Sequence, residues 1–538
     1  MKSSAAFLLV LAALPAHSES TEHLGTVSFS NSCSPAVQAS LNRGVALLHD
    51  FWYEESRKQF EQVSQADPSC AMAHWGAAMT EFHQIWGRPN EKSMATGWGE
   101  MQKADTPPAK TAREREYIAA LSGFYKPGKQ SYQDRVEAYS AAMAKLYADY
   151  PDDVDAGAFY ALSLLAAVPA NDTSLSSEHK AMAVLTPLVP KNPDHPGVVH
   201  YIIHACDTPS LAPEGLAAAV RYGEIAPSAP HSAHMPGHIF ARLGMWPQDI
   251  DANLASVAAS ESAETKHQSG AMDQFHSYDF LLYAYLQSGQ DARAKGVLES
   301  LTRLSNHFEA MPDMLNSRME GMLPYYRTKL PVFYSLEMRD WKAAAALEPV
   351  AGALPETQEL TYWARIVADG HLRDASAAGA NLARYETLLG QLRKSKHAYM
   401  ADTTGQRIEH GEVLAWAAFA DGKQESALRQ MREAADLQDK VGQGEVDIPA
   451  REMLADMLLD IHQPQQALVE YDLSLKMSPN RLNGLFHAGL AAEAVGDQPR
   501  AAKYYSLLLK STGDGSQSGR PEFAHVKSFA ATTQLAVK

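Results

Sequence analysis

Histidines in the middle of the chain recur at a spacing that suits a helix. His200 and His204 form one HxxxH pair, His234 and His238 form a second, and corresponding members of the two pairs lie 34 residues apart. Because residues four apart share one face of an α-helix, each pair points two imidazoles toward one spot. Converging imidazoles can bind a divalent transition metal, act as acid and base near neutral pH, or bind an acidic ligand.

Two more histidines extend these helical stripes. His231 precedes His234 by three positions, and His276 begins a stripe that continues with Asp279 and Tyr283. We therefore predict a metal site for zinc or copper, with Asp279 as an outer residue or base and Tyr283 as a ligand contact. The predicted metal ligands are His200, His204, His231, His234, His238 and His276.

A structural role is the alternative interpretation of these histidines. Imidazoles on helices also satisfy buried backbone and carboxylate groups, so the same stripes fit hydrogen bonding between helices. Pro236 suits the first turn of a helix, which would place His231 and His234 at a helix end and disturb their stripe. The HExxH pattern of zinc proteases is absent, because Tyr201 and Met235 follow the first histidine of each pair.

A tryptophan and a histidine near the N-terminus also share one helical face. Trp75 and His83 are separated by eight positions, with Met79 midway between them. We predict that Trp75 and His83 contact a ligand, because an aromatic ring that lines a groove can stack on a bound molecule. Packing between helices is the alternative, since aromatic residues at helical spacing commonly lie in a core.

The composition excludes several other classes of protein. The chain has 538 residues, of which 46% are hydrophobic, so it can form several packed cores and is not a disordered polypeptide. Its 47 Lys and Arg against 63 Asp and Glu give a net charge of −16, so we expect no nucleic acid partner. The sequence has no glycine-rich phosphate loop, GxSxG elbow or CxxC motif.

Helical hairpins that recur every 34 residues would position these side chains. Near the C-terminus, Ala467 and Tyr471 are followed 34 residues later by Ala501 and Tyr505, with Gly489 between the two sets. Small residues let antiparallel helices touch, and the tyrosines fill the space between neighbouring hairpins. Helical periodicity dominates the rest of the sequence, so we predict an all-α chain.

This spacing resembles the tetratricopeptide repeat (TPR) family. The same skeleton includes Gly44, Tyr53, Ser56, Phe60 and Pro68 near the N-terminus, and Ala415, Gly422, Ala427 and Ala434 before the last repeats. The resemblance implies an α-solenoid of TPR-like helical hairpins with insertions, over about residues 41–510. It also implies a concave groove, lined by the first helix of each hairpin, that binds a peptide or protein. The histidine stripes would then face one groove.

The first residues have the pattern of a signal peptide. Lys2 is followed by the apolar stretch Ala5–Ala13, and small residues allow cleavage after Ser18. We therefore expect an exported, bacterial-type TPR protein, located in the periplasm or secreted, in which Cys33 and Cys70 can form a disulfide. No later apolar run approaches the roughly 20 residues that span a bilayer, so we predict no integral membrane segment in the mature chain.

The sequence suggests a domain order and two functions. The predicted segments are the signal peptide 1–18, N-terminal TPR-like hairpins 30–165, histidine-rich hairpins 166–310, a linker or distorted repeat 311–354, C-terminal TPR repeats 355–510 and a tail 511–538. The first function is an exported solenoid that binds a peptide or protein in its groove, with or without a histidine-lined metal site. The alternative is a metal-dependent enzyme that uses the central histidine cluster.

Overall fold

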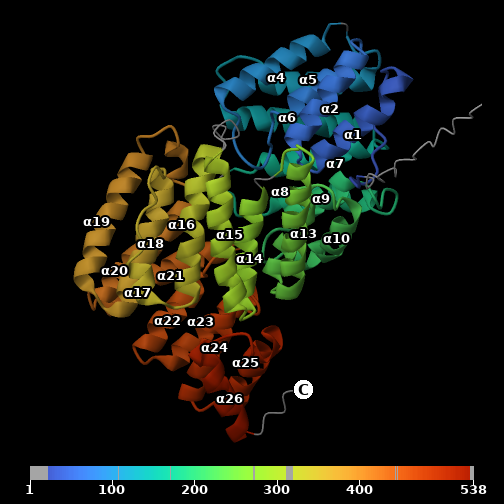
Figure 1. The fold of residues 1–538 in the computed structure, drawn as a ribbon. Helices are drawn as coiled ribbons and strands as arrows, with labels where there is room; N and C mark the ends of the chain where they lie inside the picture. The colour runs from blue at the N-terminus through green and yellow to red at the C-terminus, as the bar shows by residue number, and fades with distance from the viewer. Residues whose placement is uncertain are drawn as a thin grey trace, which may run out of the picture.

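Helical hairpins stacked side by side make up the chain in the computed structural model (Figure 1). The structure describes residues 22–533 without 107, 170, 271–272, 311–318, 443 and 445, and every regular element among them is a helix. The all-α, TPR-like solenoid predicted from the sequence is thereby confirmed. The predicted signal peptide lies outside the described residues.

The helices fall into consecutive groups along the chain. The first group is α1 (Gln38–His49), α2 (Tyr53–Ala66), α3 (Ala71–Met79), α4 (Glu91–Ala104), α5 (Ala112–Tyr125), α6 (Tyr132–Asp149) and α7 (Val154–Ala166). The central group is α8 (Ser176–Leu185), α9 (Pro196–Ala205), α10 (Ala212–Ile225), α11 (Pro230–His234), α12 (Pro236–Arg242), α13 (Trp246–Thr265), α14 (Asp273–Gln287) and α15 (Asp291–Glu309). The remaining helices are α16 (Met319–Glu337), α17 (Trp341–Ala345), α18 (Pro355–Leu372), α19 (Ala375–Leu392), α20 (Thr404–Ala420), α21 (Gln424–Val441), α22 (Ala450–Asp460), α23 (Pro464–Met477), α24 (Leu482–Ala494), α25 (Gln498–Ser511) and α26 (Pro521–Thr533).

Small residues allow the two helices of a hairpin to touch, as the repeat pattern predicts. A Cβ atom added at Gly489 of α24 would lie 2.2 Å from the ring of Tyr505 on α25. Tyr505 is 1% exposed, so its ring fills the space that the missing side chain leaves. Gly44 on α1 and Phe60 on α2 make the same kind of contact. The recurring glycines therefore allow close helix packing, with an aromatic ring of the neighbouring helix against each glycine.

Two large apolar cores meet at the histidine-rich helices. One core extends along the sequence from Phe29 to Phe240, and the other from Ala241 to Phe529. The boundary between them falls inside α12, so α11, α12 and α14 lie where the two cores join. A polar cluster placed there is held by packed helices on both sides.

The C-terminal helices fold back onto the central ones, below α14 in Figure 1. The indole nitrogen of Trp246 donates a hydrogen bond of 2.8 Å to the backbone oxygen of Asn480. At a second contact, the hydroxyl of Thr404 on α20 donates a hydrogen bond to the side-chain oxygen of Asn171 at 2.9 Å. Segments that are distant in the sequence therefore contact one another through these hydrogen bonds.

The segment predicted as a linker and the tail both contain helices. Within 311–354, α16 is helical although Pro324 and Pro331 lie inside it. In the tail, α26 buries Phe523, Val526 and Phe529 against the last hairpin. Proline inside a helix, and Gly and Ser residues just before one, both conceal helical periodicity, so the sequence left 311–354 open between a linker and a distorted repeat and assigned no structure to the tail.

The structure joins Cys33 and Cys70 by a disulfide, with their Cα atoms 4.8 Å apart, in agreement with the expected pairing. This bond ties the segment before α1 to the start of α3. Cys206 is a buried free thiol. Among the described residues, no helix combines the length and the apolar content that crossing a bilayer requires.

Candidate metal centre

Two groups of three imidazoles lie where the helical stripes predicted a metal site. The first triad is His200 and His204 of α9 with His231 of α11. The second triad is His234 of α11, His238 of α12 and His276 of α14. In each triad, one ring nitrogen from every histidine lies within 4.8 Å of the other two. The structure therefore divides the six predicted ligands into two sets.

The distances within each triad fit a shared ion. In the first triad, His200 Nε2 is 3.0 Å from His204 Nε2 and 3.2 Å from His231 Nε2. In the second triad, His234 Nε2 and His238 Nε2 are 2.9 Å apart. A tetrahedral ion with metal–nitrogen bonds of about 2.0–2.1 Å separates its ligand nitrogens by about 3.3 Å. The three distances above are slightly shorter than that separation.

Hydrogen bonds to the opposite ring nitrogens fix the proton positions in the second triad. His238 Nδ1 donates to the Asp207 carboxylate at 2.8 Å, and His234 Nδ1 donates to Asn253 Oδ1 at 2.6 Å. The Asn253 amide nitrogen donates to the backbone oxygen of Asp249 at 2.9 Å, which leaves Oδ1 as the acceptor. In the neutral rings, both Nε2 atoms therefore carry lone pairs. Two lone pairs 2.9 Å apart repel each other unless a cation lies between them.

The first triad is oriented in the same way by the backbone. His200 Nδ1 donates to the backbone oxygen of His49 at 2.6 Å, so its Nε2 lone pair faces His204 and His231. Burial lowers the pKa of His200 to about 3 and the pKa of His231 well below its usual value. Both rings are thus neutral near pH 7, the form that binds metal.

One phenylalanine packs against all three rings of each triad. The Phe51 ring centroid lies 4.5, 5.5 and 5.4 Å from those of His200, His204 and His231. The Phe280 centroid lies 4.7, 4.8 and 5.3 Å from those of His234, His238 and His276. The two triads thus share one plan: an HxxxH pair, a histidine from a neighbouring helix and an apolar ring that limits their movement.

Pro236 interrupts the helix, but it does not disturb the stripe. The break separates α11 from α12, as a proline at a first helical turn predicts. Met235, at the break, keeps helical angles of φ −53° and ψ −34°. The chain therefore continues in the same helical direction, and His234 and His238 still share one face.

A third buried group of histidines has a structural role. Asp155 Oδ1 accepts hydrogen bonds from His49 Nε2 at 3.0 Å and His195 Nε2 at 3.2 Å. The Tyr201 hydroxyl donates to His49 Nδ1, and the backbone NH of Val198 donates to His195 Nδ1. Burial raises the pKa of Asp155, but the bonds from His195 and His49 outweigh it and hold the pKa well below its usual value. These ring nitrogens are already satisfied, as the structural interpretation of the histidines proposed.

The two predicted ligand contacts near the N-terminus have different surroundings. Trp75 is 1% exposed and stacks on Phe29 at 5.4 Å, so it belongs to the N-terminal core, as its alternative interpretation proposed. His83 packs on Tyr53 at 4.3 Å and near Trp86, whose ring lies 4.8 Å from that of His231. His83 therefore lies beside Trp86, which borders the first triad.

The third stripe divides between the metal centre and a second polar cluster. His276 belongs to the second triad, and the Tyr326 hydroxyl lies 3.2 Å from its Nδ1. One turn on, Asp279 is 2% exposed and pairs with Lys329 Nζ at 2.5 Å. Tyr283 lies farther away, and its hydroxyl donates to the backbone oxygen of Asp447 at 2.9 Å. The expectation that all three face one hollow is corrected for Tyr283.

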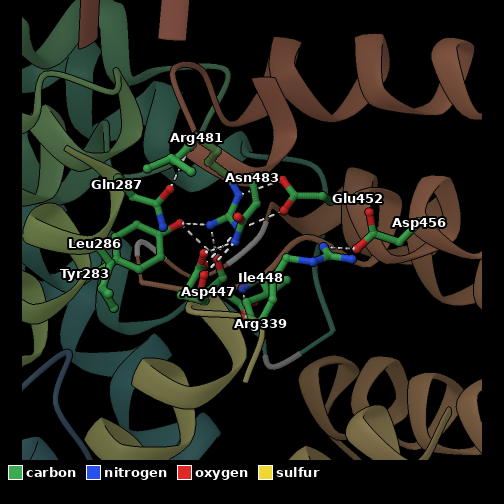
Figure 2. Close-up of polar contacts among 12 residues, drawn as sticks. Tyr283, Leu286, Gln287, Arg339, Asp447, Ile448, Glu452, Asp456, Arg481 and Asn483 are labelled. Carbon is green, nitrogen blue, oxygen red and sulfur yellow. Dashed lines mark hydrogen bonds and ion pairs between the residues drawn. The ribbon is translucent and has the colours of Figure 1, made fainter. Parts of the chain in front are cut away.

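Arg481 forms the centre of that second cluster, which Figure 2 shows. The guanidinium bonds Glu337 at 2.8 Å and Glu452 at 2.8 and 3.0 Å, and it also contacts the Tyr283 hydroxyl. Arg481 is 1% exposed, and the two carboxylates are buried as deeply. The cluster joins α24 to α16 and α22 through these contacts, and burial raises the pKa of Glu452, the second acid beside a single cation.

Sequence reasoning missed the residues that orient the rings. Asp207 follows His204 by three positions and extends its stripe by one residue, so the spacing could have predicted that it lies near the rings. Asn253 and Phe51 act from other helices or connections, and only packing brings them to the site.

The fold and the two triads together define a TPR-like helical-repeat protein with a buried cluster of imidazoles. No family model and no curated protein matches the chain. Among solved structures, the chain is similar to the human IFIT1 dimer with m7Gppp-AAAA, at TM-score 0.36 and 11% identity over 82% of this chain and 90% of that one. It is also similar to a monomeric IFIT1 mutant with Gppp-AAAA, at TM-score 0.37 and 11% identity over 86% of this chain and 95% of that one. So distant a likeness carries no information about a ligand.

Proposed function

We propose that the protein is a helical-repeat metalloprotein in which each histidine triad binds one transition-metal ion, zinc or copper. The observation that carries this proposal is the pair of Nε2 atoms of His234 and His238, which face each other at 2.9 Å. Asp207 and Asn253 hold the proton of each ring on Nδ1, so the facing nitrogens are both donors of electron pairs to a cation.

The proposed site leaves room for chemistry on a bound ion. Three imidazoles occupy three positions of a tetrahedral ion and leave a fourth for water or another ligand. An ion held in this way polarises a bound group and, if it is copper, also transfers electrons. The alternative of a metal-dependent enzyme is therefore compatible with this geometry, with the histidines as ligands and Asp207 as a positioning residue.

Metal content tests the proposal directly. Chelator-stripped protein should bind zinc or copper, up to two ions per chain, and the double variant His204→Ala/His238→Ala should lose most of this binding. The control is His179→Ala, an exposed histidine on α8. Elemental analysis after gel filtration measures the ratio of metal to protein. A chain that binds no metal would refute the proposal, and a double variant with unchanged metal content would mean that the metal binds at other residues.

Removal of Asp207 should weaken the metal without removing a ligand. Asp207 accepts from His238 Nδ1 at 2.8 Å and from Arg242 Nε at 2.9 Å, so it orients the His238 ring. Loss of such a partner lowers metal affinity by about 10–100-fold. Competition with a coloured chelator should show this loss in Asp207→Ala and no loss in the exposed control Asp194→Ala. Equal affinity in the two variants would refute the positioning role.

The resemblance to TPR proteins supports a further part of the proposal. A peptide or protein partner in the concave groove is what that resemblance implies, and net charge continues to argue against nucleic acid. Export of a bacterial-type protein to the periplasm or medium is supported by the leader-like residues 1–18 and by the disulfide between Cys33 and Cys70.

A further inference from the structure

We propose that the two triads form a single dinuclear copper site that binds dioxygen between its ions. This inference rests on the proposed function, because it requires that both triads bind metal. It adds the identity of the metal, the coupling of the two ions and the class of molecule that they bind.

Two pairs of rings from different triads are about as far apart as the most distant pair of rings within the first triad. The ring centroids of His231 and His234, one from each triad, are 6.2 Å apart, and those of His204 and His238 are 6.4 Å apart. Within the first triad, His204 and His231 are 6.1 Å apart. His231 and His234 are also neighbours on one turn of α11. Two-metal sites hold ions about 3.5–4 Å apart, a separation that one small ligand can bridge.

The charge of the site favours copper over zinc. Both triads consist of histidine alone, so the ligands bring no negative charge. The carboxylate of Asp207 is balanced by Arg242 at 2.9 Å, and that of Asp279 by Lys329 at 2.5 Å. Two divalent ions would add four positive charges among buried rings, more than the buried carboxyl of Asp249 near His238 can offset, which is costly in a medium of low polarity. Copper avoids this cost because imidazole also binds Cu(I), which carries half the charge.

Dioxygen binding keeps that charge constant. Each Cu(I) gives one electron to O2, so the O=O double bond becomes the single bond of a peroxide. The peroxide then bridges the two resulting Cu(II) ions. The pair of ions gains two positive charges, and the peroxide brings two negative ones. The net charge of the site therefore stays the same in both states, and the buried site pays no added desolvation cost.

One histidine of each triad is less buried than the other two. His204 and His276 are only half-buried, whereas His200 and His234 are fully enclosed. Trp86 lies against His231 and is 42% exposed, so its ring stands between the first triad and solvent. These residues mark the side by which dioxygen would enter.

Anaerobic copper titration followed by air tests the inference. Chelator-stripped protein should bind two Cu(I) per chain and, on exposure to O2, develop an intense near-ultraviolet charge-transfer band. The oxidised protein should give almost no electron paramagnetic resonance signal, because the bridging peroxide couples the two Cu(II) spins. His276→Ala and, separately, His204→Ala should each bind one copper, lack the band and show a Cu(II) signal. The control His179→Ala should behave like the wild type, and circular dichroism should confirm folding of every variant.

The possible failures separate this inference from the proposed function. One copper per chain, or two with a full Cu(II) signal and no band, would overturn the dinuclear site but leave metal binding intact. Tight zinc binding without Cu(I) binding would overturn both the choice of copper and the binding of dioxygen but leave metal binding intact. Absence of any metal binding would overturn both proposals.

Discussion

Replacement of Arg481 by methionine should lower the free energy of unfolding of the C-terminal repeats by about 3–5 kcal/mol, the cost of breaking a buried ion pair from one side. Arg481 holds Glu337 and Glu452, whose side chains are 1% and 3% exposed. Methionine fills part of the volume, but it leaves two buried carboxylates without their shared cation. The loss should appear as a lower urea midpoint and as faster amide hydrogen exchange in α22 and α24.

Two further variants distinguish this cause from loss of packing. Arg221→Met removes an arginine that is 47% exposed and pairs with Asp194, so it should cost about 1 kcal/mol or less. Adding Glu452→Gln to Arg481→Met should recover part of the lost stability, because one uncompensated charge is gone. If Arg481→Met cost no more than Arg221→Met, the ion cluster would not hold the C-terminal helices in place.

The sequence predicts which imidazoles converge, but not how they divide. The HxxxH spacing and α-helix geometry suffice to bring His200 to His204 and His234 to His238. The division into two triads depends on where α9, α11 and α14 pack against one another, which no local pattern encodes. Pro236 illustrates the limit, because its sequence signal correctly marks a break, and only the helical angles at Met235 preserve the stripe.

The residues around the triads are unpredictable for the same reason. Tyr283 follows His276 on one helical face, yet the charge of Arg481 draws its hydroxyl to the second cluster. His49 lies 34 residues before His83, the spacing of the repeat, but Asp155 satisfies it as a structural residue. A residue type at a spacing defines a face, whereas its role depends on charges that other repeats bring to that face.

A buried group of carboxyls should make the protein less stable at pH 8 than at pH 6.5. Burial, chiefly, raises the pKa of Glu359 to about 8 and of Glu409 to about 7, and it raises the pKa of Glu412 well above its usual value of 4.5. The folded chain then keeps protons that the unfolded chain has lost. Each such group lowers stability as pH rises between its unfolded and its folded pKa, by at most about 1.4 kcal/mol per pH unit.

The buried histidines act in the opposite direction and at lower pH. Burial lowers the pKa of His49 to about 4 and of His200 to about 3 from 6.5. The unfolded chain therefore binds more protons than the folded chain below about pH 6.5, and stability falls as the solution becomes more acidic. At pH 6.5 about half of the imidazoles of the unfolded chain are still protonated, so the histidines offset part of the loss of stability that the carboxyls cause between pH 6.5 and pH 8.

Glu412→Gln should therefore stabilise the protein at pH 8 and flatten this dependence. Glu412 is 4% exposed and accepts a hydrogen bond from the Trp363 indole at 2.8 Å, which the glutamine oxygen can also accept. The amide reproduces the protonated acid, so little should change near pH 5, while at pH 8 the cost of keeping a proton on the buried carboxyl disappears. Urea midpoints at both pH values measure the effect, with Glu386→Gln, which is 44% exposed, as the control. Parallel pH curves for Glu412→Gln and wild type would show that Glu412 ionises as readily in the folded chain as in the unfolded one.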